Sequence, residues 1–286
     1  MSLVTNFERF EAAKAGAELS FALWARLRQE AEEALSREAA LAPLFATSIL
    51  NRPTFEEAVI HRISARLGNA SLPAGLICDV FSQAAASDDA VGAGFRADIV
   101  AVLERDPACE RLIEPLLFFK GYHAIQTHRL AHWLWTKGRT DFALYLQSRA
   151  SEVFQTDIHP AAVLGRGLFL DHATGFVVGA TSVIEDNVSI LQNVTLGGTG
   201  SETGDRHPKI RHGVMIGAGA KILGNIEVGA NSRIAAGSLV VNPVPPNTTM
   251  AGVPARAVGT SGSPEPSRSM DQVLGEMAYE SFTYTI

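Results

Sequence analysis

The sequence predicts an α+β chain, with an all-helical N-terminal half, then a parallel β-helix, then a flexible tail. Apolar residues recur every three or four positions in the first half, which is the period of an amphipathic helix. In the second half they recur once every six positions. The last segment is rich in Ser, Pro and Gly. We therefore expect a helical domain over residues 1–155, a β-helix over residues 156–259 and a tail over residues 260–286.

The first half contains several helical patterns separated by breaks. Residues 21–27 and 54–60 place apolar side chains at helical spacing, with charged residues between them. An Asp-Pro pair at residues 106–107 marks a break between helices. The next helical stretch contains three histidines, two of which, His128 and His132, are four residues apart. No acidic motif such as HExxH accompanies them, so we expect ordinary packing and not metal binding.

The second half is predicted from an aliphatic residue at every sixth position, with two shifts of frame. All thirteen positions are Ile, Leu or Val, whereas such residues fill about a quarter of positions in ordinary composition. This period fits neither a helix nor an alternating strand. It is typical of a β-helix, in which each short strand points one side chain into a narrow core. The positions are Ile158, Leu164, Leu170, Val178, Ile184, Ile190, Leu196, Ile210, Ile216, Ile222, Val228, Ile234 and Val240.

Composition and charge favour a soluble cytoplasmic protein. No stretch approaches about 18 uninterrupted apolar residues, and no secretory signal is visible, so we expect no membrane span. The net charge of −6 argues against nucleic acid or an anionic membrane as the main partner. The two cysteines lack a CxxC spacing and are expected to be free thiols in a reducing compartment.

Polar residues gather at the two shifts of frame. The first shift contains Asp-His-Ala-Thr-Gly at residues 171–175, and the second covers residues 197–209, which contain Gly-Gly-Thr and Asp-Arg-His-Pro. A repeat that breaks its register only beside such residues is expected to shape a site there. Because one coil has about eighteen residues, we expect Asp157 and His172 to approach each other across neighbouring coils.

Six short motifs resemble those of the serine O-acetyltransferases: DIHPAA, LDHATG, LGGTG, GDRHPKI, IGAGAKILGNIEVG and AGVPAR. The likeness covers roughly residues 90–260 closely. It implies a left-handed β-helix that transfers the acetyl group of acetyl-CoA to L-serine, without a metal, in the first committed step of cysteine biosynthesis. One departure is Ser201, followed by Glu202, where the family often has lysine. If that loop touches the CoA phosphates, the acidic change would weaken binding.

The resemblance implies a catalytic pair and a cofactor groove. His172 would be the general base that activates the serine hydroxyl, with its ring oriented by Asp157. Backbone N–H groups of the Gly-Gly-Thr turn would stabilise the oxyanion. The CoA pantetheine would lie in a groove between adjacent prisms. The residues assigned to the cofactor are Gly198, Thr199, Ala218 and Ala236.

The resemblance also implies an acceptor site for a zwitterion. Asp106 and Asp171 would accept the ammonium group of serine, while Arg206 and His207 would bind its carboxylate. L-cysteine resembles serine closely enough to occupy the same site, so feedback inhibition by L-cysteine is expected.

The expected assembly is a homotrimer, because the faces of a solenoid need covering, or a dimer of trimers that pair through their helical domains. The C-terminal Ile286 would insert into the active site of O-acetylserine sulfhydrylase, since an apolar residue with a free carboxylate mimics an amino acid. A tail without a partner is the alternative.

Three other functions stay open from the residues alone. One is a hexapeptide acyltransferase with another acceptor, such as a sugar, an antibiotic or homoserine. Another is a γ-type carbonic anhydrase, with zinc held by histidines between subunits. The histidines available for it are His159, His172, His207 and His212. The third is a non-catalytic scaffold that regulates the sulfhydrylase through its tail.

Overall fold

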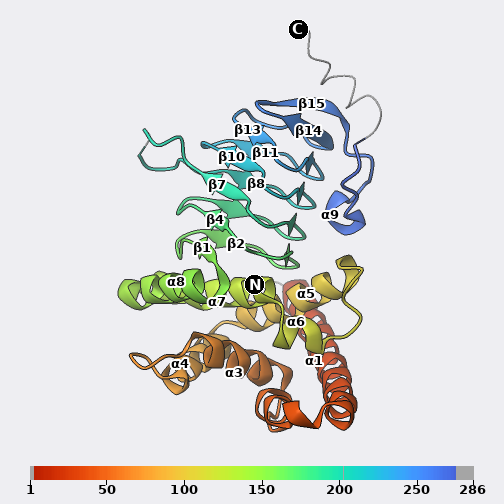
Figure 1. Ribbon diagram of the computed structural model, residues 1–286, viewed down its shortest axis with the longest axis vertical. Coiled ribbons are helices and arrows are strands. Elements are labelled where there is room, and N and C mark those ends of the chain that lie inside the picture. The colour runs from red at the N-terminus through yellow and green to blue at the C-terminus, as the bar shows by residue number, and fades with distance from the viewer. Residues whose placement is uncertain (1–2, 202, 275–286) are drawn as a thin grey trace.

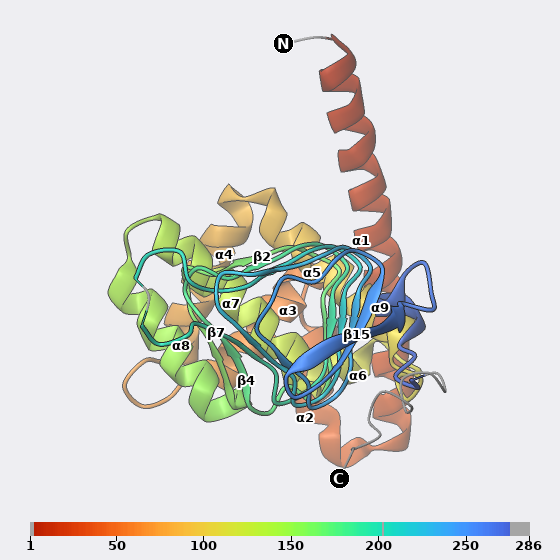
Figure 2. The same ribbon diagram turned by 90° about the horizontal axis from the view of Figure 1, so that it is seen from above.

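The computed structural model of the protein describes residues 3–201 and 203–274, with residues 3–17 described by their backbone alone. Helices occupy one end of the molecule and a stack of short strands the other (Figure 1). The N-terminal part of the long first helix projects from the body (Figure 2). The helical elements are α1 (Leu3–Arg37), η1 (Ala39–Leu41), α2 (Ala42–Phe45), η2 (Ala46–Leu50), α3 (Phe55–Leu67), α4 (Ala74–Ser87), α5 (Asp89–Arg105), α6 (Ile113–Leu117), α7 (Lys120–Thr136) and α8 (Thr140–Phe154).

Local capping explains where two central helices begin and end. Thr54 caps α3, and its side chain accepts a hydrogen bond from the backbone N–H of Glu57 at 3.2 Å. Asp88 caps α5 in the same way, by accepting from Ala90 N at 2.9 Å. Asp106 follows the last residue of α5 in an extended conformation, as the proline after it requires. These signals place Asp106 at the end of a helix.

The strands form a parallel β-helix, which confirms the prediction from the six-residue period. Three sheets run along the prism, in the orders β1-β4-β7-β10-β13, β2-β5-β8-β11 and β3-β6-β9-β12-β14, and β15 pairs antiparallel with β14. Of the thirteen predicted core positions only Leu164 is not fully buried. The strands are β1 (Thr156–Ile158), β2 (Val163–Leu164), β3 (Phe169–Leu170), β4 (Phe176–Val178), β5 (Val183–Ile184), β6 (Ser189–Ile190), β7 (Thr195–Gly197), β8 (Lys209–Ile210), β9 (Met215–Ile216), β10 (Lys221–Leu223), β11 (Glu227–Val228), β12 (Arg233–Ile234), β13 (Leu239–Val240), β14 (Thr248–Gly252) and β15 (Ala255–Thr260).

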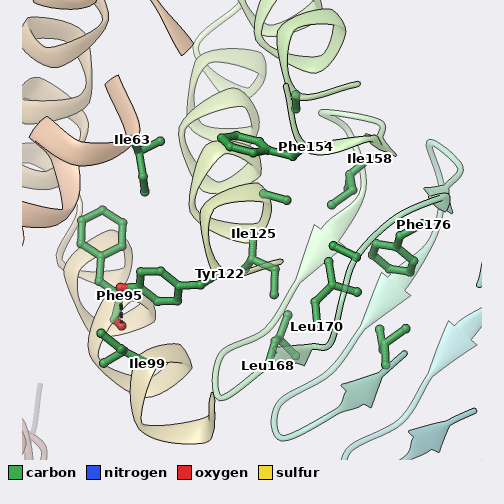
Figure 3. Packing of buried hydrophobic residues seen from close by; sticks show 14 of the residues in the cluster. Ile63, Phe95, Ile99, Tyr122, Ile125, Phe154, Ile158, Leu168, Leu170 and Phe176 are labelled. Atoms are coloured by element: carbon green, nitrogen blue, oxygen red, sulfur yellow. Dashed lines mark hydrogen bonds between the residues drawn. The ribbon is translucent and has the colours of Figure 1, made fainter. Parts of the chain in front are cut away.

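The helical domain covers the open end of the first coil. Buried side chains run without interruption from the helices into the prism, through Phe154 on α8 to Ile158 and Phe176 (Figure 3). Within the helices, the Tyr122 hydroxyl donates to the Phe95 carbonyl oxygen at 3.1 Å (Figure 3). Because the end of a solenoid exposes its apolar core, the packing of the helical domain on the prism stabilises the first coil.

Two of the α7 histidines are buried and bonded to backbone carbonyls. His123 Nε2 lies 2.6 Å from the Leu116 oxygen, and His128 Nε2 lies 3.1 Å from the Ala162 oxygen. Burial lowers the pKa of each ring to about 3. Each histidine is therefore neutral in the folded protein and donates from Nε2. His128 in this way ties α7 to the first turn of the prism.

Acid is expected to destabilise the fold through these rings. Because their folded-state pKa of about 3 lies below the ordinary 6.5, their contribution is complete above pH 6.5 and is lost as the pH falls toward 3. Each ring should lower the free energy of unfolding by about 1.4 kcal/mol per pH unit in that window. His128→Gln, whose amide still donates to Ala162, should reduce the slope by about that amount in urea unfolding. An unchanged slope would show that His128 does not contribute to this pH dependence. The control is His212→Gln, because the His212 side chain is exposed.

The segment after β15 differs from the predicted flexible tail. Residues 261–274, here called the strap, lie along the outer face of the third sheet and contain α9 (Pro266–Ser269). Ser189 Oγ donates to the Ser267 oxygen at 2.6 Å, and Arg233 Nη1 donates to the Asp271 oxygen at 2.9 Å. Polar partners on the sheet face hold the strap, a tertiary effect that its composition does not reveal. Ile286 lies outside the described residues.

No helix in the described part of the chain is long and apolar enough to cross a membrane.

Candidate active site

Two edges of the prism carry the residues singled out in the sequence, and both border the first sheet. The His172 edge is formed by the turns at residues 171–175, 191–194, 217–220 and 235–238. The Arg206 edge is formed by the turns at residues 159–162, 179–182, 198–201, 203–208 and 224–226. Residues 198–201 and 203–208 belong to the loop that projects sideways from the prism after β7 (Figure 1).

An acidic pocket lies at the His172 edge, where the helical domain meets the first coil. The pocket has a volume of about 450 Å³ and is lined in part by Asp106, Asp171 and His172, and also by Lys120, whose ammonium group is bonded to Thr174 and Gln155. Burial raises the pKa of Asp171, and the negative charge of Asp106 raises it further, while His172 acts in the opposite direction. Two carboxylates that repel each other in a half-buried pocket favour a cationic ligand such as an ammonium group.

The turn that carries His172 has an unusual backbone. His172 and Ala173 both adopt left-handed conformations, with φ of 56° and 60°. Other left-handed non-glycine turn positions of the prism are asparagines, which tolerate this region better: Asn187, Asn193, Asn231 and Asn247. A histidine and an alanine in this conformation indicate a constraint on the site. The result is a His172 side chain that is 72% exposed, with Nε2 3.5 Å from Asp171 Oδ2.

The helical domain supports this turn from below. Lys120, the first residue of α7, contacts the Thr174 hydroxyl and donates to Gln155 Oε1 at 3.1 Å. The next residue, Gly121, lies so close to β3 that a Cβ atom there would sit 1.9 Å from the Leu170 oxygen. A larger residue at 121 would therefore push α7 away from the turn.

Asp157 does not lie beside His172 in the single chain. It is exposed on β1, the terminal strand of the first sheet, opposite Val177, and its Oδ1 accepts a hydrogen bond from Gln147 Nε2 at 2.6 Å. No hydrogen bond or ion pair joins Asp157 to His172 among the residues that the structure describes, and the carboxylate beside the ring belongs to Asp171. The expected approach is missing because Asp157 projects from the sheet face, whereas His172 occupies the turn before β4.

Arg206 and His207 lie on the other edge. Arg206 packs its aliphatic stem over Gly198, where a Cβ atom would be 3.4 Å from Arg206 Cδ. His207 is only 6% exposed, and its ring lies against Gly179. Thr181 holds both residues, because its hydroxyl accepts from the backbone N–H of Arg206 at 3.0 Å and of His207 at 3.2 Å.

A single chain therefore does not form the one acceptor pocket that the sequence predicts. Asp106 and Asp171 lie at the His172 edge, whereas Arg206 and His207 lie across the first sheet. A face of six residues is about 20 Å wide, too far for one serine molecule to bridge. The reason is that coil closure sends consecutive turns to different edges.

The predicted cofactor residues divide in the same way. Ala218 and Ala236 stack on the His172 edge, where Gly237 N donates to the Ala218 oxygen at 2.8 Å. Gly198 and Thr199 belong to the Arg206 edge instead. Each edge thus carries half of the predicted acceptor residues and half of the predicted cofactor residues.

Sequence reasoning missed four residues that support the site: Gln147, Lys120, Gly121 and Thr181. None lies in a frame shift or a titratable cluster of the repeat. Gly121 and Lys120 belong to an ordinary helical pattern, and Thr181 looks like one more small polar turn residue. Their contacts cross between distant segments, so no local signal marks them.

A β-helix of six-residue turns, with an exposed histidine beside carboxylates on one edge and a basic pair on the next, defines a hexapeptide-repeat acyltransferase. Residues 23–127 match the family described as serine acetyltransferase, N-terminal, and residues 207–242 match the bacterial transferase hexapeptide with six repeats. A serine acetyltransferase of Salmonella typhimurium is 53% identical over 250 residues, which cover 87% of this chain and 92% of the relative. The chain belongs to the serine acetyltransferase family.

Solved structures agree with this assignment. The serine acetyltransferase of Brucella abortus strain S19 in complex with coenzyme A is 59% identical, with a TM-score of 0.83, covering 84% of this chain and 96% of that one. A serine acetyltransferase in complex with cysteine is 50% identical, with a TM-score of 0.87, covering 89% of this chain and 99% of that one.

Proposed function

We propose that this protein transfers the acetyl group of acetyl-CoA to the hydroxyl of L-serine, giving O-acetyl-L-serine and CoA. The observation that carries the proposal is the acidic pocket at Asp106 and Asp171, directly beside the exposed His172. An amino acid supplies the ammonium group that such a pocket favours, whereas a sugar does not. The relative that binds coenzyme A supports acetyl-CoA as the donor.

His172 acts as the general base in this reaction. Its imidazole accepts the proton of the serine hydroxyl while the oxygen attacks the thioester carbonyl carbon. Backbone N–H groups near Gly198 stabilise the oxyanion, the C–S bond breaks, and the imidazolium returns its proton to the CoA sulfur. Asp171 is the carboxylate that contacts the ring in the single chain, and Asp157 is the one that the family resemblance assigns to its orientation.

The complete site is formed between two copies of the chain in a homotrimer. The His172 edge of one copy supplies the base and the ammonium pocket, and the Arg206 edge of its neighbour supplies the carboxylate ligands. The outer faces of the first and second sheets support this packing, because Val177 and Val163 are 37% and 48% exposed there. The strap covers the third face. Further pairing of trimers through the helical domains would give a hexamer.

L-cysteine and a partner enzyme complete the proposed role. The related structure in complex with cysteine supports binding of L-cysteine in the acceptor pocket, where it would compete with serine. The resemblance further assigns the C-terminal Ile286 to the active site of O-acetylserine sulfhydrylase. We infer the cytoplasm as the place of action from the composition of the chain.

The function is tested by following CoA release with a thiol reagent. The wild-type chain should acetylate L-serine at least about a hundredfold more efficiently than 3-hydroxypropionate, which lacks the ammonium group. With 3-hydroxypropionate bound, the carboxylates of Asp106 and Asp171 have no cationic partner in the substrate. L-homoserine, L-threonine and a simple sugar complete the panel. Equal rates with a sugar and L-serine would sink the assignment of the acceptor.

A further inference from the structure

Thr181 lies at the centre of the hydrogen bonds on the Arg206 edge. Its hydroxyl oxygen accepts from the backbone N–H groups of Arg206 and His207, and the same oxygen lies 2.8 Å from His207 Nδ1. Its carbonyl oxygen accepts from Lys209 Nζ at 2.6 Å. One side chain thus connects the turn after β4 with the loop that carries both predicted carboxylate ligands.

The same contacts define the protonation of His207. The backbone N–H of Thr181 donates to His207 Nδ1 at 3.2 Å, so this nitrogen presents its lone pair. Because the Thr181 hydroxyl already accepts two N–H groups, its own hydrogen is left to donate, either to Nδ1 or to the Asp205 carboxylate, with which this side chain also forms a hydrogen bond. The ring hydrogen is then on Nε2. Burial lowers the pKa of His207, and Arg206 and Lys209 lower it further, in agreement with a neutral ring.

The Nε2 atom is available to a ligand. His207 is 6% exposed, and no described residue forms a hydrogen bond with its Nε2. The ring packs closely on the backbone of Gly179, since a Cβ atom built there would lie 2.1 Å from Nε2. A donor without a protein partner, at the accessible corner of an otherwise buried ring of fixed orientation, is suited to a ligand acceptor.

We propose that Thr181 is a positioning residue that fixes His207 as a neutral imidazole, with its Nε2–H as the donor to the carboxylate of the acceptor substrate. This inference rests on the proposed function and deepens it. Arg206 then supplies the positive charge and His207 a directed neutral hydrogen bond. Thr181 touches neither the substrate nor the reacting atoms and acts through the loop.

The test compares Thr181→Val, which keeps the shape but removes the hydroxyl, with Thr181→Ser, which keeps it. Thr181→Val should raise the KM for L-serine about ten- to a hundredfold, the usual effect of losing a hydrogen bond to a charged group. The KM for acetyl-CoA should change less than about twofold, and Thr181→Ser should restore most of the loss. The matched control is Ser182→Ala, because the buried Ser182 hydroxyl has no partner among the described residues.

A spectroscopic measurement separates positioning from folding. In protein labelled with 15N histidine, the His207 ring, assigned with His207→Gln, should show a protonated Nε2 and an unprotonated Nδ1 at neutral pH. A ring protonated on Nδ1, or a serine KM unaffected by Thr181→Val in an active enzyme, would overturn the proposal. If the wild-type chain does not acetylate L-serine at all, the proposed function fails, and comparison of the ring signals in the wild type and in Thr181→Val still decides whether Thr181 fixes this tautomer.

Discussion

Replacing His172 by alanine is expected to lower kcat about a thousandfold, because the imidazole is the group proposed to accept the serine proton and alanine cannot accept it. The KM values for both substrates should change little, since the ammonium pocket and the cofactor edge stay intact. Circular dichroism should match the wild type, because His172 is exposed and contributes nothing to the core. CoA release under saturating substrates measures the effect. Activity within about tenfold of the wild type would rule out His172 as the base.

Two further substitutions separate the roles of the neighbouring carboxylates. If Asp157 orients His172 in the assembled enzyme, Asp157→Asn should lower kcat with little change in the serine KM. If Asp171 binds the ammonium group, Asp171→Asn should raise the serine KM instead. His212→Asn, on the exposed far side of the prism, should behave as the wild type.

Two inactive variants are expected to restore each other's activity when they assemble together. His172→Ala damages one edge and Arg206→Ala the other, and the proposed site joins the His172 edge of one copy to the Arg206 edge of its neighbour. In a closed ring of mixed composition, one interface of three then carries both intact edges, which predicts about one third of wild-type activity. Co-expression with two different affinity tags, followed by tandem purification, isolates these mixed assemblies.

Mixing the two purified variants without subunit exchange should leave the mixture inactive and serves as the control. In a second control, a double variant with both substitutions in one chain is co-expressed with the wild type. The activity of these mixed assemblies should not exceed the value expected from their share of wild-type chains. If tandem-purified assemblies of the two single variants stay inactive, the proposal of a site shared between two neighbouring copies is wrong.

The β-helix was predictable because its information is local. Each coil buries one aliphatic side chain per strand against the coils next to it, so the period of Ile158, Ile184 and Ile222 is enough to identify it. The break at Asp106 was equally local, since the following proline prevents the helix from continuing. The motif around His172 indicates the proposed site for a similar reason, because the frame shift and the polar residues coincide.

What the sequence by itself determined, then, is the helical half, the six-residue coils, the family and the residue types that carry the chemistry. Only the tertiary structure assigned these residues to two edges, because coil closure and the inserted loop at 198–208 control which turns stack. The same holds for the outward Asp157, for the strap on the third sheet and for Thr181 beneath His207. Each depends on contacts between segments far apart in the chain, and a repeat pattern carries no information about those contacts.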